Sequence, residues 1–125
     1  MKVVRSVLVL ASAAAIAGCN PFTGACTTDL RFGLNVEVRD AVTGAPVADG
    51  ARLIARDGDY VEIVEGPPVP GMTFLQAAGE RAGRYTVTIQ KAGYQDWTRS
   101  NIWVRDGGCH VVTVQFEARL QPAQQ

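Results

Sequence analysis

The 125-residue sequence has few of the side chains that most enzymes use for catalysis. Beyond Cys19 it contains a single serine, Ser100, a single histidine, His110, and a single lysine, Lys91. A Ser-His-Asp arrangement would need Ser100 and His110 together, but Ser100 lies in no strand-turn-helix elbow and both residues fall within neighbouring predicted strands. We therefore expect that the protein is not an enzyme. A small secreted hydrolase is an alternative that this composition hardly supports.

The sequence also lacks an excess of charge of either sign. It has 12 basic and 12 acidic residues, and without the stretch before Cys19, which contains Lys2 and Arg5, the balance is 10 against 12, formally −2. A nucleic-acid binder carries a basic excess clustered on one face. We therefore predict no nucleic-acid partner. Glu80 and Arg81 could form an ion pair or cap a short helical turn, and our default interpretation is that both are solvated charges.

No group of residues has the spacing of a metal site or of a cofactor motif. Asp57 and Asp59 resemble the start of a calcium loop, but Val61, Glu62 and Pro68 stand where an EF-hand needs a ligand, a glycine and a glutamate. We interpret the two aspartates as part of a hairpin turn. Neither a metal nor a cofactor is expected.

A long hydrophobic run stands near the N-terminus and has no counterpart later in the chain. It extends from Val7 to Ala17, follows Lys2 and Arg5, and is interrupted only by Ser12. These are the charged and apolar regions of a secretory signal, and the run is too short for a permanent transmembrane helix. No later stretch approaches the roughly 18 apolar residues that such a helix needs.

The hydrophobic run ends in Ile16-Ala17-Gly18-Cys19, which resembles the lipobox of bacterial lipoproteins. The resemblance implies cleavage before Cys19, attachment of a diacylglycerol to its sulfur and, in many bacteria, acylation of the new amino group. Several acyl chains, each contributing about 0.8 kcal/mol per buried methylene, would give durable membrane anchoring. The alternative is an ordinary signal peptide that is cleaved at another small residue.

Two cysteines are left once Cys19 is lipidated. Export places them in a compartment where disulfides persist, so we predict a bond between Cys26 and Cys109. In the chain-entropy model, closing a loop of about 84 residues stabilises the fold by about 4.5 kcal/mol. A metal site or a reactive thiol is the alternative. A metal site needs further ligands, however, and His110 beside Cys109 lacks the paired spacing of zinc sites.

The remaining sequence alternates between apolar and polar residues in short runs. The alternation is strict from Leu30 to Arg39, and it returns at residues 84–90 and 112–117. Turn signals every 8–12 residues or so separate the runs, and no segment after Cys19 has a convincing helical period. We predict an all-β fold, an antiparallel Greek-key β-sandwich of about seven strands, preceded by a helical signal segment.

Tyr94, Trp97 and Trp103 are the candidates for a binding surface. Trp97 and Trp103 have the same parity along the predicted strand 97–104, so they could form a flat aromatic pair that stacks on sugar rings or anchors a protein. Ile102 and Val104 have the opposite parity, which leaves the register of this strand uncertain. The alternative is that the aromatic rings fill the core or its rim.

Three short motifs also follow one another along the chain. They are Asp-x-x-Thr-Gly-x-Pro at residues 40–46, Gly-x-Tyr at residues 83–85 and Gly-Tyr at residues 93–94. Together they resemble the carboxypeptidase regulatory-like domain, and the resemblance covers most of residues 30–120. It implies a transthyretin-like Greek-key sandwich that is not catalytic and has no zinc ligands.

The sequence is thus divided into a lipoprotein signal peptide at 1–18, a lipidated cysteine and short tether at 19–29, the carboxypeptidase regulatory-like sandwich at 30–121 and a tail at 122–125. We expect a non-catalytic, lipid-anchored cell-envelope protein that acts as a binding or scaffold module. Its partners would be the membrane, through the anchor, and an envelope protein or a polysaccharide. A carbohydrate or cell-wall recognition module that uses exposed aromatic residues is the alternative. Asn20, which replaces the aspartate associated with inner-membrane retention, favours the outer membrane and a periplasmic orientation.

Overall fold

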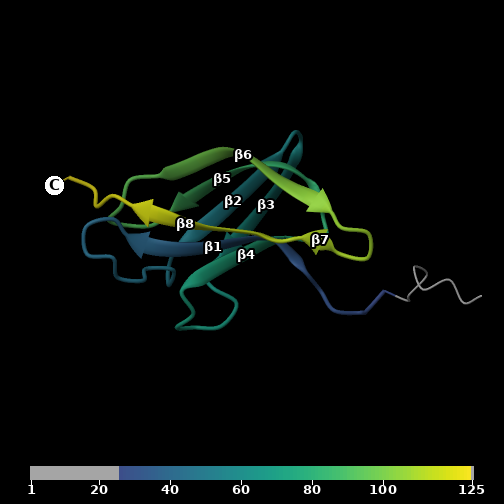
Figure 1. Cartoon of the computed structure of the whole chain (residues 1–125). Helices are drawn as coiled ribbons and strands as arrows, with labels where there is room; N and C mark the ends of the chain where they lie inside the picture. The colour runs from purple at the N-terminus through teal and green to yellow at the C-terminus, as the bar shows by residue number, and fades with distance from the viewer. Residues whose placement is uncertain (1–25, 125) are drawn as a thin grey trace, which may run out of the picture.

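In the computed structural model, which describes residues 26–124, two β-sheets pack against each other as a sandwich (Figure 1). The predicted helical signal segment, Cys19 and the first part of the predicted tether lie outside the described residues. Within residues 26–124 there is no helix, and hence none that could cross a membrane. The predicted all-β sandwich is confirmed.

Eight strands, rather than about seven, form the two sheets between residues 26 and 124. One sheet has the order β4-β1-β8, and the other has the order β3-β2-β5-β6-β7. The strands are β1 (Phe32–Asp40), β2 (Arg52–Asp57), β3 (Tyr60–Glu65), β4 (Phe74–Gly79), β5 (Gly83–Gln90), β6 (Trp97–Asp106), β7 (Val111–Val112) and β8 (Val114–Leu120).

The chain crosses several times from one sheet to the other. After β1, the β2–β3 hairpin belongs to the five-stranded sheet, β4 returns to pair with β1, and β5 crosses again to pair with β2. The pairs among the described strands are antiparallel except for β1 with β8, which run parallel. This departure from the predicted antiparallel pattern follows from the short connection between β7 and β8. Because β8 enters at the end where β1 begins, the two strands run in the same direction.

The two ends of the sandwich differ in what they contain. The first described residues and the β6–β7 loop lie at one end, and the C-terminal residues lie at the other (Figure 1). We call these the disulfide end and the loop end. The C-terminal residues are held to the loop end, because Pro122 forms a β-bridge with Tyr94 and the Ala123 N–H donates to the Gly93 carbonyl. Part of the predicted tail at 122–125 is therefore attached to the fold.

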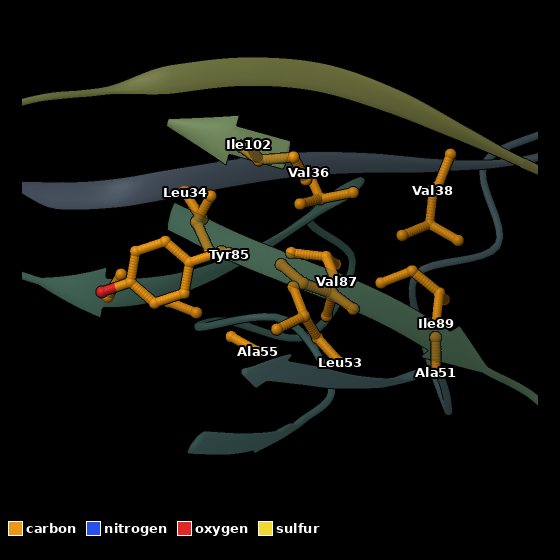
Figure 2. Packing of buried hydrophobic residues seen from close by; sticks show 14 of the residues in the cluster. Leu34, Val36, Val38, Ala51, Leu53, Ala55, Tyr85, Val87, Ile89 and Ile102 are labelled. Carbon is orange, nitrogen blue, oxygen red and sulfur yellow. The ribbon is translucent and has the colours of Figure 1, made fainter. Parts of the chain in front are cut away.

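The hydrophobic core lies between the two sheets and is built from alternate residues of the strands. The side chains of β1 and β5 face each other across it (Figure 2). These buried residues are Leu34, Val36 and Val38 of β1 and Tyr85, Val87 and Ile89 of β5. Each such aliphatic side chain stabilises the fold by about 1.5–3 kcal/mol when it is removed from water. The strict alternation in the sequence therefore corresponds to the inner faces of both sheets.

A β-bulge in β6 explains the two parities of residues 97–104. The register between β5 and β6 shifts at Asn101, which has a φ of 57°. Before the bulge Trp97 pairs with Ile89 on the core side, whereas after it Trp103 pairs with Arg84 on the solvent side. One extra residue reverses which side chains face the core. The odd-numbered Trp97 faces the core before the bulge, and the even-numbered Ile102 and Val104 face it after the bulge.

The predicted hairpin turn at Asp57 and Asp59 is confirmed, and the chain turns again after β1. Asp57 pairs with Tyr60 at the end of the β2–β3 hairpin, and Gly58 between them has a φ of 57°. After β1, the N–H of Gly44 donates to the Asp40 carbonyl at 2.9 Å, and Gly44 has a φ of 74°. Both glycines occupy the left-handed region that residues with a Cβ rarely adopt.

Gly33 marks a close approach of β1 to β6 and generates a test of the packing. A Cβ at this position would lie 2.6 Å from Val104 Cγ1 and 3.1 Å from the Ala78 carbonyl oxygen. Gly33→Ala should therefore lower the free energy of unfolding by about 1–3 kcal/mol. In Gly79→Ala, the matched control, the new Cβ would lie 3.3 Å from the end of the exposed Leu30 side chain, so the loss should be less than half as large. Equal losses in urea unfolding would contradict this packing.

Candidate functional site

The structure separates the three aromatic residues that were predicted as a binding surface. Tyr94 is half-buried, and its hydroxyl donates to Asp40 Oδ2 at 2.8 Å. Trp97 is half-buried and stacks on Phe116, with 6.0 Å between ring centroids. Trp103 is exposed. The two tryptophans do not form a pair on one strand face, because the bulge in β6 places Trp97 and Trp103 on opposite faces. Trp97 packs against the core, which agrees with the alternative that the rings fill the core or its rim.

Tyr94 links the β5–β6 connection to the turn after β1 at the loop end. The Asp40 carboxylate that accepts its hydroxyl also accepts the backbone N–H groups of Val42 at 2.7 Å and Thr43 at 2.9 Å. The hydrogen bonds from Thr43, from the Tyr94 hydroxyl and from Val42 hold the pKa of Asp40 below its ordinary value. Tyr94 thus has a structural partner that sequence analysis did not reveal, since 54 positions separate it from Asp40.

The different environments of Trp97 and Trp103 predict different effects of removing each ring. Trp97→Ala would leave a gap beside Phe116 and should lower the free energy of unfolding by about 2–4 kcal/mol. Trp103→Ala should lower it by less than about 1 kcal/mol, because the ring lies at the surface. Urea unfolding of the two variants measures both values. An equal loss in the two variants would contradict their placement on opposite faces.

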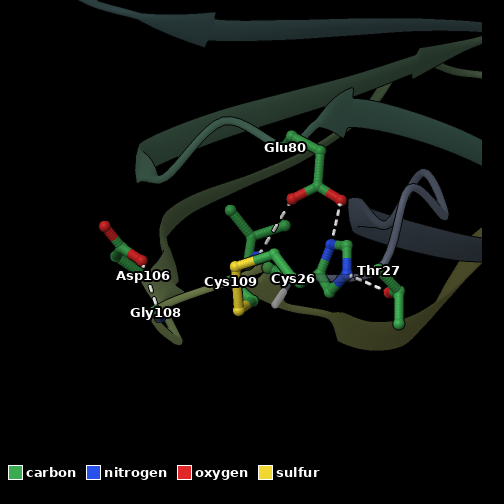
Figure 3. The surroundings of a disulfide bond; sticks show 8 residues. Cys26, Thr27, Glu80, Asp106, Gly108 and Cys109 are labelled. Atoms are coloured by element: carbon green, nitrogen blue, oxygen red, sulfur yellow. Dashed lines mark hydrogen bonds and ion pairs between the residues drawn. A yellow bond between two sulfur atoms is a disulfide. The ribbon is translucent and has the colours of Figure 1, made fainter. Parts of the chain in front are cut away.

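At the disulfide end, Cys26 and Cys109 form the predicted disulfide bond (Figure 3). Their Cα atoms are 5.1 Å apart, and the bond joins residues separated by 83 positions. It links the segment before β1 to the loop between β6 and β7. The chain therefore has a covalent connection at the point where the described residues begin.

Glu80 lies beside this disulfide and joins three segments of the chain (Figure 3). Its Oε1 accepts the backbone N–H of Arg31 at 2.7 Å and lies 2.6 Å from His110 Nδ1, while its Oε2 accepts the N–H of Val111 at 3.3 Å. The other ring nitrogen of His110 lies 2.7 Å from Thr27 Oγ1. Glu80 was predicted to be a solvated charge. Its partners come from distant segments, which the local sequence does not indicate.

The contacts of Glu80 predict how its loss affects stability at different pH values. The hydrogen bond to His110, followed by those from the backbone, lowers the pKa of Glu80. The ionised group therefore stabilises the fold above its ordinary pKa of about 4.3, and this contribution is lost as the pH falls through the lower, folded-state pKa. Glu80→Gln should reduce stability at pH 7 and weaken its decline below about pH 4.3.

A pH series of urea unfolding midpoints measures this effect. Asp59→Asn, which removes an exposed carboxylate that forms no ion pair with any described residue, is the control for the change in net charge. A profile for Glu80→Gln that stays parallel to the wild-type profile at every pH would contradict the role assigned to Glu80.

Arg81 is held by groups of β2, β3 and β5. Its guanidinium lies 3.0 Å from Asp57 Oδ2 and donates to the Tyr85 hydroxyl at 2.9 Å, and it stacks over the Tyr60 ring at 3.8 Å from the centroid. The hydrogen bond to Tyr85, and then that to Asp57, raise the pKa of Arg81. The interpretation of Arg81 as a solvated charge is wrong. The hydroxyl of a buried tyrosine usually has a polar partner. The expected burial of Tyr85 was therefore the one signal in the sequence for a contact of this kind.

The two residues that a serine hydrolase would need have separate partners. Ser100 lies on the outer face of β6, where it accepts a hydrogen bond from the Thr86 hydroxyl at 3.4 Å, whereas His110 lies beside Thr27 and Glu80 at the disulfide end. Within the described part of the chain, no group of three His, Cys, Asp or Glu side chains is placed to hold a metal ion.

The outer face of the five-stranded sheet carries arginines that lack carboxylate partners. Arg56 of β2 pairs with Thr86 of β5, and Arg84 of β5 pairs with Trp103 of β6, followed two residues later by Arg105. Among the described residues, no ion pair includes any of these three arginines. The guanidinium carbons of Arg84 and Arg105 lie 4.7 and 4.5 Å from the Trp103 ring centroid, within the range of cation–π contacts.

The opposite outer face, on the three-stranded sheet, has its charges compensated. Arg39 of β1 forms an ion pair with Glu37, and Arg119 of β8 forms one with Glu117 at 2.6 Å. Among the arginines of the described strands, those without an ion pair therefore all lie in the five-stranded sheet. This is so although the chain after Cys19 has more acidic than basic residues.

A hollow of about 320 Å³ lies at the loop end of the five-stranded sheet, and its polar groups are already paired. Arg52 bonds Glu65 at 2.7 Å, Gln90 donates to Asp96 at 3.1 Å, and the Lys91 ammonium bonds a backbone carbonyl. A ligand in this hollow would compete with these bonds for part of the polar groups. The arginines and Trp103 at the other end of the same face are the better candidate site.

A search of protein-family models finds no match to this chain, and a search of curated protein sequences finds none either. The resemblance to the carboxypeptidase regulatory-like domain therefore stays a prediction, which rests on the motifs at residues 40–46, 83–85 and 93–94.

Proposed function

We propose that the protein is a non-catalytic, lipid-anchored module of the bacterial cell envelope that binds or positions another envelope component. The observation that carries the proposal is the lipobox-like tetrapeptide that ends at Cys19, seven residues before Cys26. Cys26 is in turn bonded to Cys109 at the disulfide end of the sandwich. An acylated Cys19 would therefore attach this end of the domain to a membrane.

The short distance along the chain between Cys19 and Cys26 supports this role. Seven residue steps from Cys19 to Cys26 span at most about 25 Å when fully extended, so the disulfide end would stay near the membrane surface. The loop end, at the opposite end of the sandwich, would lie farther from the membrane than the disulfide end (Figure 1). Following the argument from Asn20, we place the protein on the outer membrane, facing the periplasm.

Exposed apolar side chains at the loop end support a binding role. Val42 in the turn after β1 is 74% exposed, and Val69 and Met72 in the β3–β4 connection are also exposed. Loops that present apolar residues on a rigid scaffold are common recognition surfaces. We infer that this end meets the envelope partner. The proposed membership in the carboxypeptidase regulatory-like family agrees with a binding role and with the lack of catalysis.

Acyl labelling of cysteine variants tests the anchor. In cells grown with a labelled fatty acid, Cys19→Ala should lose the label, because no other cysteine follows a lipobox. The matched control is the double variant Cys26→Ala/Cys109→Ala, which removes the disulfide and keeps the lipobox, and it should remain labelled. Gel fluorescence of the purified proteins measures the label. A labelled Cys19→Ala protein that stays with the membrane fraction would overturn the proposal.

A further inference from the structure

We propose that the five-stranded sheet docks with part of its outer face on an anionic phospholipid surface next to the anchor. The surface, here called the arginine face, consists of Arg56, Arg84 and Arg105 with Val61, Trp103 and Val112. This inference deepens the proposed function and rests on it for the nearness of the membrane. The chemical feature that is recognised is the layer of lipid phosphates.

Pairing between strands places these side chains on one face. Val61 of β3 is opposite Arg56 of β2, and Arg105 of β6 is opposite Val112 of β7. Residues directly opposite each other in an antiparallel pair point to the same side of the sheet. Val61, Val112 and the ring of Trp103 are each 45–52% exposed. Apolar and cationic side chains thus alternate across the sheet.

The charges of this face are available to a ligand. Arg56, Arg84 and Arg105 form no ion pair with any carboxylate of the described residues. Guanidinium groups bind phosphate oxygens through two parallel hydrogen bonds and lose water more readily than ammonium groups. The arginine face therefore complements a surface that is rich in phosphate.

The exposed apolar residues favour a lipid surface over a soluble acidic polysaccharide. Tryptophan and arginine beside aliphatic side chains are typical of proteins at the membrane–water interface, where rings sit among the headgroups. Stacking on a sugar would need a free ring face, whereas Trp103 already contacts the guanidinium groups of Arg84 and Arg105. A polysaccharide would also leave Val61 and Val112 without an apolar partner.

The position of the arginine face also fits a membrane. Arg56 is the next-to-last residue of β2, Arg84 is the second residue of β5 and Arg105 is the next-to-last residue of β6, so all three lie toward the disulfide end. Through the proposed anchor this end stays within about 25 Å of the bilayer. Docking is then intramolecular, so weak contacts suffice for a large docked fraction.

Fluorescence of Trp103 in vesicles tests the proposal. The full-length product is purified from membranes as the Trp97→Phe variant, which leaves Trp103 as the single tryptophan. It is mixed with vesicles of phosphatidylcholine alone, or of equal parts phosphatidylcholine and phosphatidylglycerol, that contain lipids brominated near the carbonyl end of their acyl chains. Flotation of the vesicles reports anchoring, and quenching of Trp103 by bromine reports docking.

We expect quenching in the anionic vesicles and little in the neutral ones. Each arginine near an anionic surface contributes about a fivefold preference, so Arg84→Gln/Arg105→Gln should reduce the docking constant about 30-fold. The control Arg31→Gln/Arg119→Gln makes the same change of charge at exposed positions outside the arginine face and should behave like the parent variant. Raising the salt to about 1 M, where the Debye length is about 3 Å, should release the arginine face from the anionic vesicles.

The outcomes separate docking from anchoring. Flotation with both vesicle types but no quenching of Trp103 would overturn docking and leave the anchor standing. Quenching by anionic vesicles without flotation on neutral ones would support docking and overturn the anchor. Equal quenching in both vesicle types, or equal losses in the two double variants, would also overturn docking. So would a response of Trp103 to an acidic polysaccharide, such as alginate, without a response to anionic vesicles.

Discussion

Burial of alternate side chains of β1 and β5 between the two sheets is the constraint on which the rest of the molecule depends. Val36 and Val87 meet at the centre of this contact, and neither has any exposed surface. Once these residues point inward, their neighbours on each strand must point outward. The packing of the core therefore decides that Arg84 lies on the solvent side of the five-stranded sheet. The position of an arginine on the surface is in this sense a consequence of the hydrophobic pattern.

Sequence analysis predicted the parts of the fold that depend on local pattern. The alternation from Leu30 to Arg39 predicted β1, and the number of cysteines, together with the predicted export signal, predicted the disulfide. It could not predict the bulge at Asn101, because a strand bulges relative to a partner strand that the local pattern does not include. Long-range polar contacts were missed for the same reason. Glu80 meets Arg31 across 49 positions, and Arg81 meets Asp57 across 24.

The candidate site was predicted in part, and the reason lies in how the bulge divides β6. Trp103 belongs to the predicted aromatic set and does lie on an exposed face, but Trp97 faces the core and packs against Phe116. The arginines of the arginine face come from β2, β5 and β6, and each looks like an ordinary surface charge in the sequence. Only the pairing of these strands brings them together, while the arginines of the other sheet are neutralised by neighbouring glutamates.

The disulfide also determines how the domain would respond to a mechanical load. A force on the segment before Cys26 passes through the bond to Cys109 and into the loop between β6 and β7, so it reaches both sheets at once. Without the bond, the same force would act on the beginning of β1 and could peel this strand from β4 and β8 one hydrogen bond at a time. Under the proposed anchor, a pull on this segment would thus be shared between β1 and the β6–β7 loop and would not act on β1 alone.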